Sequence, residues 1–485
     1  MLGITAYGAY LPRLRLQRKA AASANAWFAP GLGSARGERT MANWDEDSVT
    51  MAVEALRDAL PAPEQRDGIG TLVAASTTFP FADRQNAGIV AAALALPEAI
   101  AAMDVTGSLR AGTSALVAAL QSAAFTGAPA IAVASDRRKA RAASSQELAC
   151  GDGAAGVVVG HDGVVARFVG SHAVAVDFVD HFRGEGEDFD YAWEERWVRD
   201  EGYGRIVPKA VAAALKRHAI DPAAVAAFLL PAPFAKIEQQ VAKACGIDPA
   251  RAVAPPSDTV GDCGAAQALL MLVSALEKVG PGDILVVAAF GQGVDVVIFE
   301  VTPAITGYRP ARGFAGALKD RKEESNYQKF LAFNGLVPLE KGMRAEKDTK
   351  TALTVTYRKR DMLFSLKGGK CSVCGTAQFP RSRICVNPNC RAVDTQEPYS
   401  FAEKKGSVLS WSADYLTFAM DPPQHYGMIT FAEGGRFIAD FTDVAPGDVE
   451  TGMDVRMVFR VKDFDERRGF RRYFWKAVPV REPVG

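Results

Sequence analysis

Four of the seven cysteines in this chain fall within twenty residues, and their spacing constrains the fold more than any other feature. They stand in the segment CSVCGTAQFPRSRICVNPNC as two close pairs separated by a ten-residue loop. Each pair fits a tight turn that directs two thiolates at one point, and two such turns complete a tetrahedral site. Four thiolates leave no position open for water, so we expect a structural zinc. The predicted ligands of this zinc ribbon are Cys371, Cys374, Cys385 and Cys390.

The ribbon separates parts of the chain with different patterns. Residues 1–303 alternate short apolar runs with Ala-rich stretches of helical pattern, which predicts an α/β domain with helices on both faces of its sheet. Residues 304–350 lack a sheet pattern, and their charged stretch KDRKEESNYQKF indicates a solvated helix or linker before the ribbon at 351–400. The expected buried strands are Thr71–Ala75, Ala130–Ala134, Ala154–Val159, Ala226–Leu230, Ile284–Ala288 and Val296–Val301.

The α/β part repeats itself. Ala111–Ser135 and Cys263–Phe290 both run from a turn of small residues through a long apolar helix and a Gly/Pro turn into a buried strand. The spacing agrees, because 19 residues separate Gly112 from Ile131 and 20 separate Gly264 from Ile284. An internal duplication of about 150 residues explains this pattern, although Ala-rich helices can also resemble one another by chance.

Residues 401–485 predict a small β barrel. About five β-rich runs are separated by the turn signals Asp421-Pro422, Gly434-Gly435 and Pro446-Gly447, which suits an OB-fold. Aromatic side chains on such a barrel could stack on nucleic-acid bases. The segment has no interleaved basic stripe, so we interpret its aromatic residues as core.

Charge and hydropathy exclude several classes of function. The formal net charge is zero, which gives no electrostatic argument for nucleic acid or an anionic membrane as partner. The first residues are too polar for a signal peptide, and no run of about 18 uncharged apolar residues predicts a membrane span. Clustered cysteines without a secretion signal favour a metal site in a reducing cytoplasm. The scattered Cys150, Cys245 and Cys263 are expected to be buried thiols.

Five segments of the α/β part carry a family resemblance. They are GAYLPRLRL near the start, DEDSVTMAVEALRDAL, ELACGDGAAGVVVG, PFAKIEQQVAKACG and FGQGVDVVIFEVT. Residues 1–303 resemble the thiolase-like superfamily, and within it the 3-hydroxy-3-methylglutaryl-CoA (HMG-CoA) synthases. The remainder resembles the zinc-ribbon/OB-fold proteins that accompany many thiolase-like enzymes, usually as a separate subunit. The resemblance implies a duplicated thiolase-like fold, acyl-CoA chemistry and an oligomer.

The resemblance also shows which catalytic residues are changed. In the family a cysteine starts the buried helix of the first half, where helix N–H groups lower the pKa of its thiol and stabilise an oxyanion. The corresponding stretch DVTGSLRAGTSAL puts Leu109 at the cysteine's place, with Ser108 adjacent. The family's acid/base glutamate falls near Thr77 and its histidine near Pro231. Three changes together argue against ordinary synthase or thiolase chemistry in this chain alone.

The remaining catalytic candidates lie in recognisable family segments. Asp262 replaces an asparagine of a Gly-Asn turn, and Cys263 stands beside it at the start of the second half's buried helix. His181 begins HFRGEGEDFDYAWEERW, where the family builds its substrate pocket. Lys236 in PFAK matches a lysine that contacts the phosphates of coenzyme A. Each residue also has an ordinary structural interpretation, as a buried turn residue, a core histidine or a surface lysine.

Three functions remain open from the sequence. The first is a thiolase or acyltransferase assembly acting on acyl-CoA, in which a Cys-bearing thiolase-like partner chain supplies the nucleophile. The second is an aldol or retro-aldol lyase, which needs acid/base groups and an oxyanion pocket but no thiolate. The third is a non-catalytic scaffold subunit of a thiolase-like complex. By family analogy we expect a homo- or hetero-oligomer formed through the duplicated domain.

Overall fold

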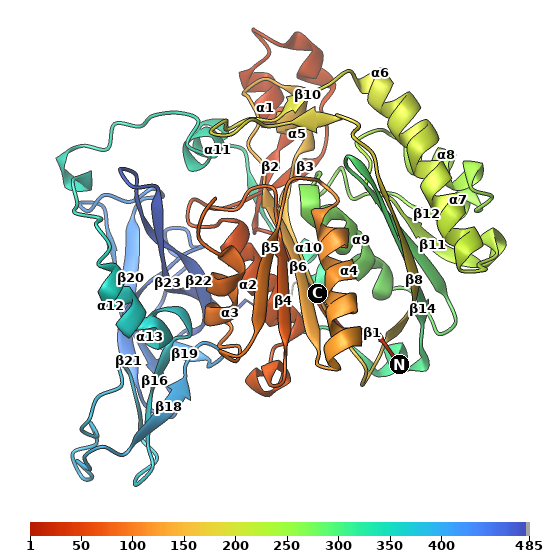
Figure 1. Cartoon of the computed structure of the whole chain (residues 1–485). Helices are drawn as coiled ribbons and strands as arrows, with labels where there is room; N and C mark the ends of the chain where they lie inside the picture. The colour runs from red at the N-terminus through yellow and green to blue at the C-terminus, as the bar shows by residue number, and fades with distance from the viewer. Residues whose placement is uncertain (482–485) are drawn as a thin grey trace.

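The computed structural model describes residues 1–481, and its first part is built on one ten-stranded sheet (Figure 1). Three parallel strands, β5, β4 and β6, are followed by the antiparallel β7. The same pairing recurs in β12, β11, β13 and β14, which confirms the duplicated α/β fold. The strand order is β12 (Ala252–Val253), β11 (Val225–Leu229), β13 (Ile284–Phe290), β14 (Gly293–Val301), β8 (Ala166–Ala175), β1 (Gly3–Tyr10), β7 (Asp152–Gly160), β6 (Ala130–Arg137), β4 (Thr71–Ala75) and β5 (Ala101–Val105).

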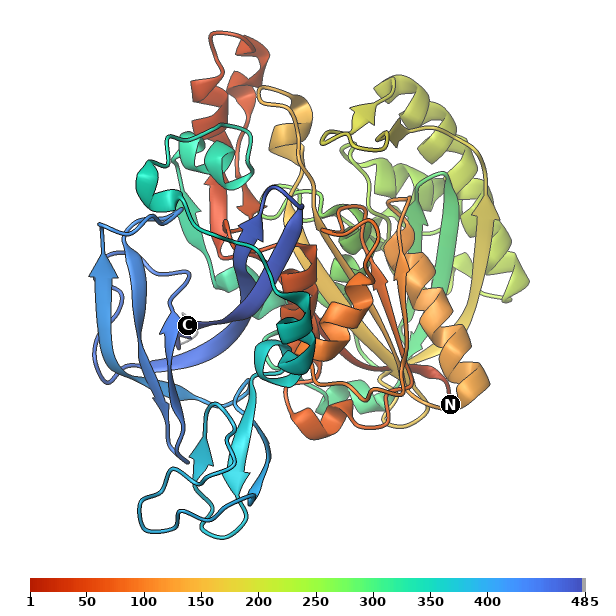
Figure 2. The same ribbon diagram turned by 60° about the vertical axis from the view of Figure 1, so that its left-hand side comes forward.

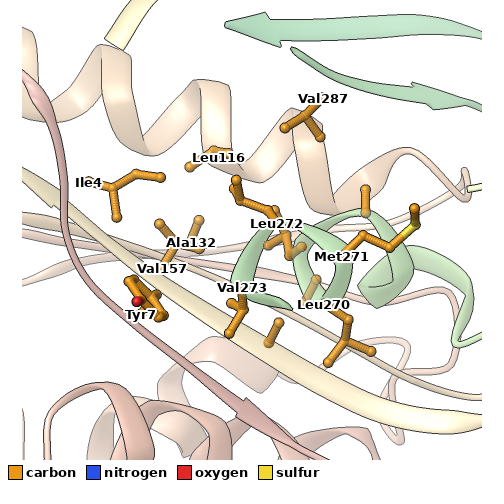
Figure 3. Packing of buried hydrophobic residues seen from close by; sticks show 14 of the residues in the cluster. Ile4, Tyr7, Leu116, Ala132, Val157, Leu270, Met271, Leu272, Val273 and Val287 are labelled. Carbon is orange, nitrogen blue, oxygen red and sulfur yellow. The ribbon is translucent and has the colours of Figure 1, made fainter. Parts of the chain in front are cut away.

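The corresponding helices of the two halves, α4 (Ala111–Thr126) and α9 (Gln267–Leu276), pack on each other in the interior. Every residue of α9 is buried, as its uninterrupted apolar sequence QALLMLVSAL requires. Figure 3 shows Leu116 of α4 and Leu272 of α9 in this interior with Val157 of β7. The two helix starts approach closely, since a Cβ at Gly112 would lie 2.2 Å from the carbonyl oxygen of Ala265.

Outer helices cover the opposite faces of the sheet. Alternate residues of β6 divide between two cores, because Ala132 faces α4 whereas Ile131 and Val133 face the outer helices. The outer helices of the first half are α2 (Ser48–Ala59) and α3 (Asn86–Ala93), and those of the second are α7 (Val207–Arg217) and α8 (Ile237–Ala244). Smaller elements at the sheet's carboxyl end are β2 (Leu14–Gln17), α1 (Arg18–Ala24), β3 (Glu38–Met41), α5 (Ser145–Ala149), β9 (His181–Phe182), β10 (Tyr191–Ala192) and α6 (Glu195–Trp197).

The segment predicted as a solvated linker is instead partly integrated into the first domain. Strand β15 (Lys322–Glu324) pairs in parallel with β2, which also pairs with β3. Helix α11 (Tyr327–Phe333) buries Tyr327, Phe330, Leu331 and Phe333 in a core shared with Leu16 and Met41. The prediction was wrong because charged residues dominate the segment while its aromatic side chains face inward. Helix α10 (Gly313–Lys319) precedes β15 and packs on β1 and α9.

Beyond these elements the chain forms two small β structures. After α12 (Leu353–Arg358) and α13 (Arg360–Phe364), a three-stranded sheet contains β17 (Ala377–Gln378), β16 (Lys367–Cys371) and β18 (Gln396–Ser400). A five-stranded sheet follows in the order β21 (Arg436–Asp440), β20 (Gln424–Phe431), β19 (Gly406–Asp414), β22 (Asp454–Asp465) and β23 (Phe470–Pro479). The three predicted turns separate its strands, which confirms the small OB-type barrel. The last four residues of the predicted barrel segment, 482–485, lie outside the described residues.

The barrel packs on helix α2 of the first domain, and α13 lies between α3 and barrel strand β23, as the second view also shows (Figure 2). One apolar cluster contains Leu56 of α2, Val90 of α3, and Phe459 and Trp475 of the barrel. The two parts therefore share a core. Among residues 1–481 no helix combines the length and the apolar character needed to cross a bilayer.

Candidate active site and metal centre

The start of helix α4 lacks a nucleophile. Leu109 is half-buried one residue before the N-cap Arg110, and its aliphatic side chain cannot attack a thioester. The hydroxyl of the neighbouring Ser108 donates to the carbonyl oxygen of Gly291 at 2.6 Å. Arg110 forms an ion pair of 2.7 Å with Asp295 of β14. The residues around this helix start therefore tie the two halves together.

The buried carboxylate of Asp136 joins the two halves of the first domain. Asp136, at the end of β6, accepts hydrogen bonds from the hydroxyls of Ser76, Thr77 and Thr78 at 2.8–2.9 Å. It also accepts from the backbone N–H groups of Thr77 and Ala265, both at 2.7 Å. Thr77 follows β4 of the first half, and Ala265 follows the Asp262 turn of the second. The sequence analysis missed Asp136 because its partners are remote along the chain.

A chain of charged side chains connects the Asp262 turn to the β9–β10 hairpin. Arg138 donates to Asp262 at 3.1 Å and to Asp190 at 2.9 Å. Asp190 stands just before β10 and also accepts from Arg183 at 2.9 Å. Arg183 in turn donates to the carbonyl oxygen of Thr77. These contacts fix the hairpin to the Asp262 turn and to the loop after β4. Basic residues directly after a buried strand were the signal that could have identified Arg138.

His181 forms a side-chain pair with its neighbour Asp180. Its Nδ1 lies 2.9 Å from Asp180 Oδ2, and both side chains are mostly buried. Nε2 makes no hydrogen bond to any described residue, and Asp180 Oδ1 is buried without a partner among those residues. A carboxylate on Nδ1 fixes the tautomer and leaves Nε2 as the atom that can accept a proton.

Tyr203 contacts Pro231, the residue that the sequence analysis placed near the histidine of the resembled family. It lies in a π-helix, Val198–Ile206, and its hydroxyl donates to the carbonyl oxygen of Pro231 at 3.3 Å. π-helical turns are frequent at functional sites. Burial raises the pKa of Tyr203, and the negative charges of Asp262 and Asp180 raise it further. The hydroxyl therefore stays protonated at neutral pH and can act as a hydrogen-bond donor.

Cys263 lies in a less reactive environment than its position suggested. Its side chain is completely buried, and a Cβ at Gly153 would lie 3.1 Å from its sulfur. Burial raises the pKa of the Cys263 thiol well above its usual value, and Asp152 and Asp262 raise it further. Such a site disfavours the thiolate.

Two other residues from the sequence analysis lie apart from this turn or are equally unreactive. Burial raises the pKa of the Cys150 thiol. Lys236 is exposed at the start of α8.

The four clustered cysteines converge as the ribbon spacing predicts. Their sulfur atoms all lie within 4.8 Å of one another, with 3.6 Å between Cys374 and Cys385 and 3.9 Å between Cys371 and Cys390. Zn–S bonds of about 2.3 Å in a tetrahedron place sulfurs about 3.8 Å apart. The donor set and its spacing therefore fit zinc. Cys371 and Cys374 lie at the turn after β16, and Cys385 and Cys390 come from the loop before β18.

Comparisons with known families match two segments of this chain. Residues 215–299 match the family described as the C terminal of 3-oxoacyl-[acyl-carrier-protein] synthase III. Residues 399–460 match the family described as the C-terminal OB-fold domain of ChsH2. The two matched segments lie in the second half of the duplicated sheet and in the barrel.

Similar proteins include several named hydroxymethylglutaryl-CoA synthase. The one from Methanopyrus kandleri is 29% identical over 322 residues, covering 64% of this chain and 90% of the relative. The one from Caldivirga maquilingensis is 26% identical over 348 residues, covering 70% of this chain and 99% of the relative. These alignments extend the likeness over about two thirds of the chain.

Solved structures share the fold of the first domain. A structure of MvaS in complex with 3-hydroxy-3-methylglutaryl coenzyme A has a TM-score of 0.58 at 20% identity, covering 70% of this chain and 92% of its own. A 3-oxoacyl-(acyl carrier protein) synthase III, FabH, from Pseudomonas aeruginosa has a TM-score of 0.55 at 20% identity, covering 62% and 98%.

Proposed function

We propose that this chain, which joins a thiolase-like domain to a C-terminal OB-fold, is an enzyme that binds an acyl-CoA thioester. It cleaves or forms the Cα–Cβ bond of the acyl group by aldol chemistry. The relatives named hydroxymethylglutaryl-CoA synthase support the substrate class. The observation that carries the reaction type is the Asp180–His181 pair, with a free Nε2, in a domain that has Leu109 instead of the nucleophilic cysteine.

In the cleavage direction His181 acts as the general base. Nε2 takes the proton of a β-hydroxyl group, the Cα–Cβ bond breaks, and Cβ becomes a ketone or aldehyde. The electron pair of the broken bond forms the enolate of the remaining acyl-CoA. The protonated imidazole then returns the proton to Cα, so protons and electrons balance. Aldol addition is the same sequence in reverse.

Two further residues have supporting roles in this proposal. When the thioester binds, the protonated Tyr203 hydroxyl turns from the carbonyl oxygen of Pro231 and donates its hydrogen bond to the thioester oxygen as negative charge develops there. Asp180 holds the imidazole in the required tautomer and stabilises its protonated form. Lys236, exposed at the start of α8, contacts the phosphates of coenzyme A.

The experiment is an assay of β-hydroxyacyl-CoA cleavage by the zinc-loaded full chain. His181→Gln should lower kcat by about 10²–10⁴-fold, the usual contribution of general base catalysis, with the fold unchanged. His161, whose Nε2 lies 3.2 Å from the Ala123 carbonyl oxygen, provides the control His161→Gln, which should retain activity. Equal activity of the two variants would contradict the proposal, as would thiolysis by the chain alone.

A second candidate is the thiolase-type assembly with a Cys-bearing partner. Strand β5 favours it, because β5 ends the ten-stranded sheet and its Met103 is 40% exposed. An unpaired edge strand offers backbone groups for pairing with another chain. Co-purification with a thiolase-like protein, and acyl-CoA cleavage only in the complex, would favour this candidate. A complex without any catalytic contribution from this chain would instead identify a scaffold subunit.

The ribbon has a structural role in either case. One zinc ion bound by the four thiolates stabilises the two loops around β16 and β18. No coordination position remains for a substrate or a water molecule.

A further inference from the structure

A cavity of about 510 Å³ lies between the helical segment before the ribbon and the ribbon itself. Arg358–Met362 of the helical segment form one wall, and Pro380–Arg383 with Asp394, Gln396 and Pro398 form the other. Small-molecule sites commonly have volumes of about 300–1,000 Å³. Figures 1 and 2 show β16–β18 at the end of the molecule opposite to the β9–β10 hairpin. The cavity is therefore separate from the candidate active site.

The rim of the cavity carries an excess of positive charge. Six basic residues line it, against the two acidic residues Asp361 and Asp394. Arg383 is neutralised by Asp394 at 2.6 Å, and Arg360 by Glu98 at 2.7 Å. The other four cations have no ion-pair partner among residues 1–481, and they are Arg358, Lys359, Lys367 and Arg381. Unpaired cations around one opening attract an anionic ligand.

A buried amide with no partner lies in the same cavity. Gln396, on β18, is only 5% exposed, and its Oε1 and Nε2 both lack hydrogen bonds within the described part of the chain. Buried polar atoms are normally satisfied, so an unpartnered amide beside a cavity indicates a ligand with a matching donor and acceptor, which the Gln396 side chain meets by turning toward the opening. Gln396 packs against Gly369 of β16, where a Cβ would lie 2.6 Å from Gln396 Oε1 and 3.1 Å from Arg381 Cγ.

We propose that this cavity binds the phosphorylated adenine nucleotide portion of a ligand. A glutamine amide can accept a hydrogen bond from the adenine amino group and donate one to a ring nitrogen at the same time. Pro380, Pro398 and Met362 supply apolar surface for the faces of the base. The unpaired Lys367 and Arg381 bind the phosphates. Free nucleotides and coenzyme A both carry this chemistry.

The test is calorimetric titration of the zinc-loaded full chain with ADP, coenzyme A, GDP and inorganic pyrophosphate. We expect ADP to bind more tightly than GDP and pyrophosphate. The double substitution Lys367→Ala/Arg381→Ala should weaken ADP binding at least tenfold. Gln396→Leu should weaken ADP but leave pyrophosphate unchanged, with zinc content preserved. Arg436→Ala, which removes an exposed cation on β21 outside the cavity, should have no effect.

The comparison of ligands identifies the source of the nucleotide. Binding at the cavity is identified by its sensitivity to Lys367→Ala/Arg381→Ala. If ADP binds there more tightly than coenzyme A, the ligand is a free nucleotide. If coenzyme A binds there more tightly than ADP, the ligand is coenzyme A. Nucleotide affinity that is unaffected by the cavity variants overturns the proposal. GDP or pyrophosphate binding as tightly as ADP overturns the adenine assignment.

Discussion

Asp45, which precedes helix α2, and Lys476, on the last strand of the barrel, form an ion pair of 2.8 Å with both side chains buried. The Lys476 ammonium also lies 4.1 Å from the centre of the Trp44 ring. Beside this pair, Arg460 of the barrel lies 3.0 Å from Glu46. Charges removed from water in this way bind the barrel and the first domain to each other with fixed geometry.

Breaking this ion pair should destabilise the whole chain. Lys476→Met leaves the buried Asp45 carboxylate with only the more distant Arg460, whose Nε lies 3.7 Å from Asp45 Oδ1, and breaking a buried pair costs about 3–5 kcal/mol of unfolding free energy. The matched control is Lys462→Met on the neighbouring strand, because Lys462 pairs with Asp440 while remaining 39% exposed. That change should cost less than about 1 kcal/mol. Urea unfolding measures both, and equal losses would contradict the role assigned to Asp45–Lys476.

Glu54 should make stability depend on pH. Burial alone would raise the pKa of Glu54, but Arg57, Arg456 and Arg460 outweigh burial and lower it from 4.5 to about 2. Ionised Glu54 therefore contributes stability that is fully present above about pH 4.5 and is lost as the pH falls toward about 2.

Glu54→Gln should remove this dependence, with a loss on the order of 3 kcal/mol at pH 7. Unfolding free energies measured between pH 3 and 7 should then vary less in the variant than in the parent. The exposed Glu450 provides the control Glu450→Gln. A variant with an unchanged pH profile would exclude Glu54 as the source.

The strand pattern was readable from the sequence because the central strands are buried on both faces. The predicted Thr71–Ala75 coincides with β4, and the predicted Ala226–Leu230 differs from β11 by one residue at each end. Edge strand β5 has the sequence AAMDV and is only partly buried, so it lacks the continuous apolar signal of its neighbours.

The candidate site was harder to predict because the residues that contact one another there are remote in the sequence and meet only in the folded chain. His181 and Asp262 were identified from family segments, but their connection runs through Arg138, which follows β6. Tyr203 lies in a segment of mixed polarity whose π-helical turn has no simple periodic signal. Asp180 was part of the sequence next to His181, yet its role depends on a backbone that directs both side chains to one place.

Zinc should bind at one ion per chain. Cys371→Ser removes one of four converging sulfurs and should lower the zinc content of the purified protein, because an incomplete thiolate set binds zinc weakly. Ser372→Ala is the matched control, since Ser372 lies between the ligands and donates to the carbonyl oxygen of Thr395. Metal analysis gives the result, and a fully loaded Cys371→Ser variant would contradict the assignment.

Cys263 should be dispensable for catalysis. Burial and nearby carboxylates raise the pKa of its thiol, so at neutral pH almost none of it is thiolate. Cys263→Ala should keep kcat/KM within about twofold and cost on the order of 1 kcal/mol of stability. Iodoacetamide should leave Cys263 unlabelled in the folded protein, as mass spectrometry can detect. A folded Cys263→Ala variant with at least tenfold lower kcat would restore this thiol as a nucleophile candidate.

Asp190 should position the β9–β10 hairpin, and with it the proposed base His181, without touching the substrate. Its carboxylate accepts from Arg138 and Arg183 at 2.9 Å each, and these bonds fix the β9–β10 hairpin that begins with His181. Asp190→Asn keeps the shape of the side chain but removes the charge that balances two guanidinium groups. The hairpin should loosen and His181 should lose its position, which lowers kcat/KM by about 10–100-fold, since displacements near 1 Å have effects of this size.

Asp188 provides the matched control for this change. It lies two residues away, is 66% exposed, and pairs only with the half-exposed Lys139 among the described residues. Asp188→Asn should therefore leave kcat/KM within about twofold. Hydrogen exchange of residues 180–192 should accelerate in Asp190→Asn and not in Asp188→Asn, because only the first substitution removes buried ion pairs. Two results would contradict this role of Asp190. The first is an equal acceleration of hydrogen exchange in both variants. The second is a fall in kcat/KM of Asp190→Asn while its hydrogen exchange is unchanged.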